Sequence, residues 1–249
     1  MSTKARHTRR IARDIPVRIR QLHAWDVTVE EAVEIQNRLA KRLALVTPLR
    51  GKIRTVAGAD ISYDRRSDRI WAALVVFSHP SLAIVEQRVS TSRVRFPYIP
   101  GLLSFREVPP LLGCFEELEE TPDVLLLDGQ GIAHPRGFGL ASHVGLLTGI
   151  PTVGCAKSRL IGDHGRVAVR AGSFSPLYYN RRKVGVALRT RNAVRPVFVS
   201  CGYRVTLRRA ISLVLSSLKG YRVPEPLRAA HVLANRARQS KSVRVELPV

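Results

Sequence analysis

The chain has 249 residues, and its 41 Lys and Arg against 19 Asp and Glu give a formal net charge of +22 at pH 7. Hydrophobic residues make up 45% of the sequence, which supplies a core and excludes a disordered basic tail protein. No apolar run reaches the roughly 18 residues of a membrane span, and the basic N-terminus lacks the apolar segment of a secretory signal. The three cysteines lie far apart without a C-x-x-C pair, so we expect no disulfide, no zinc site and a cytoplasmic location.

The basic residues are unevenly distributed. Residues 165–249 contain 18 Lys and Arg but only two acidic residues, whereas residues 106–130 contain seven acidic residues and a single arginine. A positive excess of this size favours a polyanionic partner, because each contact with a phosphate releases counterions. Charge alone does not identify the chemistry, since a basic composition also serves solubility.

In the first part of the chain, the pattern predicts a helix followed by three strands. The helix is expected over residues 28–46 and begins with a capping box, because Thr28 is followed three residues later by Glu31. The strand-like runs are 53–62, 69–78 and 82–90. Short polar turns separate these runs, which indicates an antiparallel meander.

A proline-rich turn and a second helix are expected next. The sequence FPYIPG at 96–101 predicts a rigid turn. Residues 102–120 have a helical pattern that includes Pro109 and Pro110. Because proline is tolerated best near a helix start, we expect the helix to begin at these prolines.

The second half alternates short strands with helices. An apolar strand at 123–128 precedes a glycine-rich loop, as expected where both sheet faces are covered. Helices are further expected at 140–148, 206–218 and 226–238, and strands at 152–155, 184–188 and 197–199. This order predicts one α/β domain with a mixed sheet. We expect the domain to span residues 21–249, behind a flexible basic arm of residues 1–20.

Two aspartates occupy places where an unpaired charge is unfavourable. Asp60 lies within a predicted strand and Asp128 ends one, so each needs a cation, hydrogen bonds or a proton. Structural roles remain open at this point, because Asp128 can cap the following turn and Asp60 can be held by hydrogen bonds.

Several motif-bearing sites are absent from the sequence. It has no G-x-x-x-x-G-K-[ST] loop, no complete G-x-G-x-x-G motif, no H-x-E with P-C-x-x-C and no G-x-S-x-G. Oxygen ligands on a strongly basic protein remain, and Mg²⁺ binds one or two carboxylates together with phosphate oxygens. A metal ion beside a phosphodiester activates water and stabilises developing charge, so a metal-dependent nuclease is the leading hypothesis.

Several motifs together resemble endonuclease V, a family of deoxyinosine-specific nucleases. They are QLHAWD (21–26), VAGADISY (56–63), FPYIPGLLSFRE (96–107), LLLDGQGIAHPRGFGLASH (125–143), PTVGCAKSRL (151–160), PVFVSCG (196–202) and VPEPLRAAH (223–231). FPYIPG followed by a glutamate, and DGQG followed by HPR, are the specific signals. The resemblance implies an RNase H-like mixed sheet flanked by helices, with three antiparallel strands followed by parallel ones.

The resemblance also implies a metal site. Asp60, Glu107 and Asp128 correspond to the family's metal-binding carboxylates, so the implied cofactor is Mg²⁺, with Mn²⁺ as a substitute.

Three further positions match catalytic residues of the family. His134 corresponds to a histidine of the active-site loop that positions or deprotonates water, which suits a neutral imidazole near pH 7. Lys157 corresponds to a lysine that contacts the phosphate, and His231 to a second histidine near the metals. Without the family, these residues are also compatible with a loop histidine, a surface lysine and a structural helix histidine.

The turn formed by Pro97, Tyr98, Ile99 and Pro100 resembles the family's strand-separating wedge. Proline fixes φ, so ordering the tip costs little, and Tyr98 can stack where a base is displaced. A tight turn with a packed tyrosine is the structural alternative.

The resemblance places a lesion pocket, built largely from main chain, near Gly101, Leu103, Gly129 and Gly139. Hypoxanthine carries an O6 acceptor where adenine has an amino donor. Backbone N–H groups in the pocket can therefore distinguish the two bases.

The implied function is a DNA repair endonuclease that recognises deoxyinosine and nicks the same strand at the second phosphodiester bond on its 3′ side. It would leave 3′-hydroxyl and 5′-phosphate ends. The expected partner is deoxyinosine-containing DNA, and we expect a monomer without membrane association. Inosine-containing RNA is an alternative substrate. A catalytically silent nucleic-acid-binding protein, in which the acids are structural, is the alternative from another class.

Overall fold

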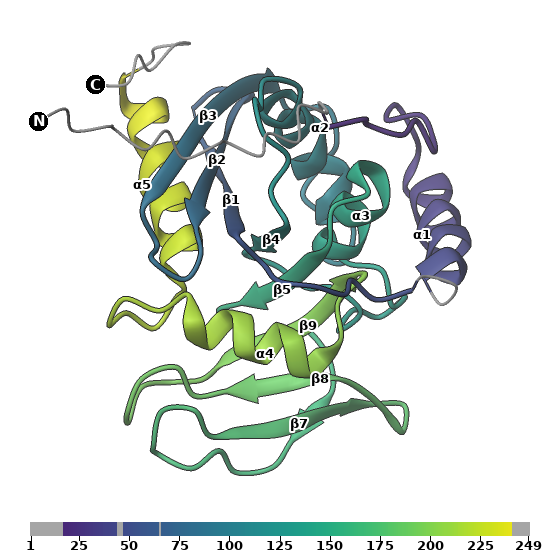
Figure 1. Cartoon of the computed structure of the whole chain (residues 1–249). Coiled ribbons are helices and arrows are strands. Elements are labelled where there is room, and N and C mark those ends of the chain that lie inside the picture. Colours follow the sequence, from purple (N-terminus) through teal and green to yellow (C-terminus); the bar gives the residue numbers. More distant parts are fainter. Residues whose placement is uncertain (1–16, 44–46, 65, 241–249) are drawn as a thin grey trace, which may run out of the picture.

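A nine-stranded sheet forms the centre of the protein, with the strand order β3-β2-β1-β4-β5-β9-β8-β7-β6 (Figure 1). The structure is a computed structural model and describes residues 17–43, 47–64 and 66–240. The strands are β1 (Thr55–Tyr63), β2 (Arg69–Ser78), β3 (Ile84–Arg93), β4 (Val124–Leu127), β5 (Thr152–Ala156), β6 (Asp163–His164), β7 (Phe174–Tyr179), β8 (Arg182–Leu188) and β9 (Val197–Tyr203). Parallel and antiparallel pairs both occur, so the predicted α/β class with a mixed sheet is confirmed.

Strand pairing brings two distant carboxylates together. β1, β2 and β3 form the predicted antiparallel meander, while β1, β4 and β5 are parallel. Ala59 of β1 pairs with Leu127 of β4. The residues that follow this pair, Asp60 in β1 and Asp128 just after β4, therefore lie side by side at the carboxyl end of β4. Beyond β5, the remaining strands continue the sheet through antiparallel pairs.

Helices cover both faces of this sheet (Figure 1). They are α1 (Val29–Leu43), α2 (Leu103–Glu116), α3 (Leu140–Thr148), α4 (Leu207–Ser216) and α5 (Glu225–Ser240). α2 and α3 pack with Leu125 and Leu127 of β4, and α4 and α5 pack with Val124 and Leu126 on the other face. The side chains of β4 thus enter two apolar cores alternately, which explains why the strand is apolar throughout.

The first helix begins as predicted. Glu31 N donates to Thr28 Oγ1 at 3.2 Å, and Thr28 N donates to Glu31 Oε2 at 2.8 Å, which completes the capping box. The helix is described as far as Leu43, and residues 44–46 of the prediction lie outside the described residues.

The predicted start of the second helix is wrong. α2 begins at Leu103, and Pro109 and Pro110 lie inside it. Each proline lacks the N–H that would bond to the preceding turn. The helix persists because its apolar face is buried, with Phe105 and Val108 almost inaccessible to solvent.

Strands β6 and β7 are absent from the prediction. β7 contains Pro176, which is disfavoured in a central strand but tolerated near a sheet edge. Only the last part of β7 pairs with the two-residue strand β6, so Pro176 has no partner strand on that side in the described structure.

Residues 1–16 of the predicted N-terminal arm lie outside the described residues. In the rest of it, Val17 and Ile19 pack against the core beneath α2 and α3, and Arg20 N donates to Leu147 O at 2.9 Å. None of the described helices has the length and apolar character needed to cross a membrane.

Candidate active site

A pocket of about 430 Å³ lies where β1 and β4 end. Most residues singled out in the sequence line it: Asp60, Tyr98, Ile99, Pro100, Gly101, Leu103, Glu107, Asp128, Gly129, His134, Gly139 and Lys157. Pro97 and His231 do not line the pocket, although His231 contacts Asp60. The fold therefore gathers residues from five separate segments into one hollow.

Asp60 is held by a histidine of α5. His231 Nδ1 donates to Asp60 Oδ2 at 2.6 Å, and His231 Nε2 accepts from Asn235 Nδ2 at 3.0 Å. Burial raises the pKa of Asp60, the charge of Asp128 raises it further, and the hydrogen bond from His231 opposes the rise. The two neighbouring aspartates therefore repel each other, and His231 partly relieves Asp60.

Glu107 of α2 faces the same pocket and is only 8% exposed. Its carboxylate accepts a hydrogen bond from the Tyr63 hydroxyl. Burial raises the pKa of Glu107 to about 8, the Tyr63 hydrogen bond opposes the rise, and the charges of Asp60 and Asp128 add to it. Ionising Glu107 is therefore unfavourable in this pocket, because two aspartates already lie nearby.

Asp128 is paired with Lys157, the residue after β5. Burial lowers the pKa of Lys157, but the charge of Asp128 and its hydrogen bond more than offset this, so the net shift is upward. Lys157 therefore remains an ammonium and acts as the counter-ion of Asp128 in this structure.

The donor chemistry of the pocket fits a hard divalent cation. Three mutually repelling carboxylates offer the oxygen ligands that Mg²⁺ prefers. Their present arrangement is not a ready-made metal site, because the described residues contain no group of three or more His, Cys, Asp or Glu side chains placed to hold an ion. His231, Tyr63 and Lys157 each bind one carboxylate instead. The metal-binding roles therefore stay predictions.

His134 is part of the hydrogen-bonded wall of the pocket. Its Nε2 donates to Gly101 O at 2.9 Å, and its Nδ1 accepts from Arg136 N at 3.3 Å. Gly101 O also accepts from Arg136 Nη2 at 2.7 Å and from Gln36 Nε2 at 3.0 Å. Burial lowers the pKa of His134 to about 4, and the charge of Arg136 contributes. Both ring nitrogens are occupied, so this geometry favours positioning over the expected proton transfer with water.

The wedge-like turn exposes its tyrosine. Tyr98 is 69% exposed, whereas Phe96 and Leu102 on either side of the turn are buried. Leu102 N donates to Ile99 O at 2.9 Å, which closes the turn. The packed-tyrosine alternative is therefore wrong, and the ring is available to a partner.

Two glycines of the pocket are tightly packed. A Cβ on Gly139 would lie 2.3 Å from Gln130 O, so only glycine fits there. The N–H of Gly139 donates to Gly131 O, and the N–H of Gly129 to Leu127 O, both at 2.9 Å. These two N–H groups are already bonded, which limits the predicted reading of a base by backbone donors.

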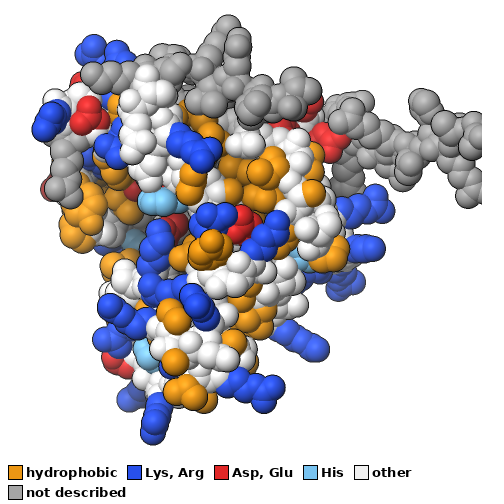
Figure 2. All heavy atoms as spheres, turned by 90° about the vertical axis from the view of Figure 1, so that its left-hand side faces the viewer, with side chains coloured by type: hydrophobic (Ala, Val, Ile, Leu, Met, Phe, Trp, Pro, Cys, Tyr) orange, Lys and Arg blue, Asp and Glu red, His pale blue; other side chains and the backbone are white. Residues whose placement is uncertain are grey.

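Eight lining residues escaped the sequence analysis, and three of them, Gln36, Ser104 and Gln130, are polar and buried. Gln36 is almost fully buried and donates to two backbone carbonyls, those of Gly101 and Phe138. The sequence signal that could have identified Gln36 is its position among the apolar residues on the buried face of α1. On the face shown in Figure 2, Lys and Arg are the prevailing charged side chains, and only a few acidic ones lie among them.

Comparisons with known proteins agree on one family. Residues 37–232 match the family model of Endonuclease V. An endonuclease V of Dehalococcoides mccartyi is 50% identical over 218 residues, which cover 88% of this chain and 97% of that protein. The crystal structure of endonuclease V from Streptomyces avermitilis has a TM-score of 0.83 at 40% identity and covers 91% of this chain and 99% of that one.

A third relative was solved with nucleic acid. It is Ciona intestinalis endonuclease V in complex with a 23mer DNA containing an inosine followed by a ribo-adenosine. Its TM-score is 0.75 at 26% identity, covering 87% of this chain and 100% of that one. The family model spans most of this chain, and the first relative is half identical to it. The chain therefore belongs to the endonuclease V family of nucleases.

Proposed function

We propose that this protein is a metal-dependent DNA repair endonuclease that recognises deoxyinosine and nicks the same strand at the second phosphodiester bond on its 3′ side. The products would carry 3′-hydroxyl and 5′-phosphate ends. The observation that carries the proposal is the shared pocket, which combines three carboxylates, a lysine and the exposed Tyr98 turn. The inosine-containing DNA bound by the Ciona relative supports the substrate.

In this proposal, Asp60, Glu107 and Asp128 would hold Mg²⁺ or Mn²⁺. Their oxygen donors and mutual repulsion favour a hard cation. Such an ion, when bound, lowers the pKa of water and neutralises charge that develops on the phosphate. Glu107 and Asp128 would first exchange their present partners, Tyr63 and Lys157, for the ion.

The remaining polar residues position the reacting groups. Lys157, released from Asp128, would contact a phosphate oxygen and stabilise the transition-state charge as a point cation. His231 holds one oxygen of Asp60 in place. His134 fixes the carbonyl of Gly101 and thereby the wall of the recognition pocket.

Lesion recognition would begin with the turn from Pro97 to Pro100. The exposed ring of Tyr98 can stack on a base next to the displaced nucleotide. The flipped hypoxanthine would then enter the hollow between Gly101 and Leu103 on one side and the glycine loop after β4 on the other.

Cleavage of inosine-containing RNA is the second candidate function. The DNA bound by the Ciona relative carries a ribo-adenosine directly after its inosine. This ribonucleotide supports inosine-containing RNA as the alternative substrate. The third candidate is a catalytically silent nucleic-acid-binding protein, which would bind nucleic acid through the same basic surface but would not cleave it.

An end-labelled duplex with a single inosine tests the proposal. With Mg²⁺, we expect the wild type to cut at the second bond 3′ to the inosine and Asp128→Ala to leave the strand intact. Glu34→Ala, which removes an exposed carboxylate on α1, is the matched control. Equal nicking by wild type and Asp128→Ala would contradict the role of Asp128.

Two further measurements distinguish the DNA nuclease from the RNA nuclease and from the silent binding protein. Matched DNA and RNA strands with one inosine decide which sugar is preferred. In EDTA, the proposed enzyme loses nicking, whereas a silent binder never nicks and keeps its affinity.

A further inference from the structure

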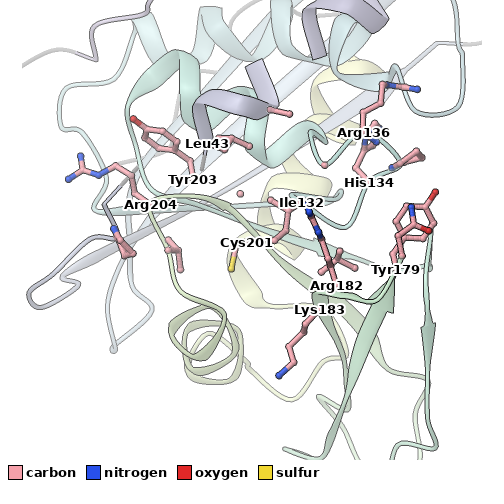
Figure 3. A pocket seen from close by; sticks show the side chains of 18 residues that line it. Leu43, Ile132, His134, Arg136, Tyr179, Arg182, Lys183, Cys201, Tyr203 and Arg204 are labelled. Atoms are coloured by element: carbon pink, nitrogen blue, oxygen red, sulfur yellow. The ribbon is translucent and has the colours of Figure 1, made fainter. Parts of the chain in front are cut away.

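A second cavity, of about 890 Å³, adjoins the candidate active site (Figure 3). His134 lines both cavities, so the loop of residues 134–137 separates them. The tip of the β7–β8 hairpin and the end of β9 form other walls. We call this cavity the basic groove and define it by Arg136, Tyr179, Arg182, Lys183 and Arg204.

The charge of the groove has one sign. Its described lining contains four cationic side chains and no acidic one. Arg136 is bonded to Gln36 and to Gly101 O, and Arg204 Nε donates to Thr47 O at 3.4 Å. Arg182 and Lys183 are exposed, and neither side chain has a hydrogen-bond or ion-pair partner among the described residues. Uncompensated cations around a hollow attract a polyanion.

Arg182 is the cation best placed inside the groove. Figure 3 shows its side chain rising toward Ile132, whereas Lys183 extends away. The alternation follows from their neighbouring positions on β8, because successive side chains of a strand point to opposite faces.

The backbone around the groove gives an independent indication. Arg204 has φ +52, and the hairpin tip before Arg182 is a two-residue turn in which Asn180 has φ +48 and Arg181 has φ +61. Glycine is easier to place at such angles than arginine, and Asn-Gly is the usual pair in this kind of turn. Of these positions, Arg204 lines the groove and keeps an arginine where glycine fits better, which points to a function for its charge.

We propose that the basic groove is a second nucleic-acid subsite that holds the sugar–phosphate backbone flanking the lesion. Arg182 and Arg204 bind its phosphates, and Tyr179 offers a ring to a base. The identity of this occupant rests on the proposed function, because a DNA strand that leaves the active-site pocket across the 134–137 loop would enter the groove. Arginines without acidic partners and an aromatic ring are the usual elements of such a path.

Binding to an inosine duplex, measured by fluorescence anisotropy in EDTA so that no strand is cut, tests this subsite. Arg182→Gln should weaken binding about fivefold and reduce the salt dependence by roughly one phosphate contact. Lys52→Gln is the matched control, because Lys52 is exposed and precedes the start of β1, at the opposite end of that strand from Asp60. Arg182→Lys keeps the charge and should recover most of the affinity.

Trimming the duplex locates the contact. When the flank on one side of the inosine is shortened, wild type and Arg182→Gln should bind equally; shortening the other flank should leave their difference intact. Arg204→Gly should also weaken binding while its Tm stays level or rises, because glycine relieves the left-handed conformation.

The proposal is overturned if Arg182→Gln binds the full duplex as tightly as Lys52→Gln, or if its defect is the same on both trimmed duplexes. Nicking of the full duplex by the wild type in Mg²⁺ reports on the proposed function separately. A flank-dependent binding defect without any wild-type nicking would support the subsite and reject the enzyme.

Discussion

The Nε2 of His134 donates to the carbonyl oxygen of Gly101 at 2.9 Å, which ties the loop after β4 to the end of the wedge-like turn. Arg136 and Gln36 donate to the same oxygen. Three donors on one carbonyl restrain the backbone that presents Tyr98. The histidine that the family resemblance associates with water thus has a structural task that can be measured.

His134→Gln should reduce the loss of stability between pH 7 and pH 5. Burial and Arg136 lower the pKa of His134 to about 4 in the folded protein, against 6.5 for an ordinary histidine. Between these values only the unfolded state binds the proton, so stability falls as the pH falls, by roughly 2 kcal/mol at pH 5 from this residue. Urea unfolding of both proteins at the two pH values, in EDTA, measures the difference. Equal losses would contradict the neutral, buried ring.

Glu107→Gln should stabilise the fold and abolish nicking. Burial and the two aspartates raise the pKa of Glu107 to about 8, so at pH 7 this carboxyl must take up a proton on folding, and glutamine avoids that cost. The amide oxygen of glutamine can still accept from Tyr63. We expect a gain of roughly 1–3 kcal/mol in the free energy of unfolding, measured in EDTA.

Glu225→Gln is the matched control for this substitution. Glu225 is equally buried, but Arg228 donates to both of its oxygens, at 2.7 and 2.8 Å. Its loss should therefore destabilise the protein. If both substitutions changed stability in the same direction, the electrostatic cost assigned to burying Glu107 would be disproved.

Lys157→Met should lower the cleavage rate and also the Mg²⁺ concentration needed for half-maximal activity. The rate should fall by roughly 10²–10³-fold, because a cation that stabilises the transition state is removed. Less Mg²⁺ should suffice, because Asp128 loses the ammonium that competes for its oxygens. Single-turnover nicking over a Mg²⁺ series gives both quantities, and a higher Mg²⁺ requirement would argue against this competition.

Tyr98→Ala should weaken binding to inosine-containing DNA by roughly tenfold and affect undamaged DNA much less, because stacking of one base contributes about 1–3 kcal/mol. The ring is 69% exposed, so Tm should not change. Tyr178→Ala, which removes another exposed tyrosine, is the control. An unchanged ratio of the two affinities would show that Tyr98 is not a wedge.

Local interactions made part of the fold predictable from the sequence. The Thr28–Glu31 capping box joins groups three residues apart, and α3 has the predicted bounds, Leu140–Thr148. β4 was predictable because both of its faces are covered, which leaves a continuous apolar run. Even the candidate site residues were identifiable, since the motifs that contain them are contiguous.

Packing between distant segments decided the rest. α2 runs through two prolines because its buried face outweighs their local preference, and β7 forms around Pro176 beside an incomplete edge. Neither element can be predicted from a short stretch of sequence, because the packing that stabilises it involves distant residues.

The family, the fold class and the three carboxylates that line the pocket were all predictable from contiguous motifs in the sequence. The pairing of β1 with β4 places Asp60 beside Asp128, and packing of α2 buries Glu107 next to them, which no local pattern predicts. The tertiary structure likewise placed Arg182 and Arg204 around one groove. These properties escape prediction because the burial and pKa of a side chain depend on its neighbours on other strands and helices, and strand register sets those neighbours.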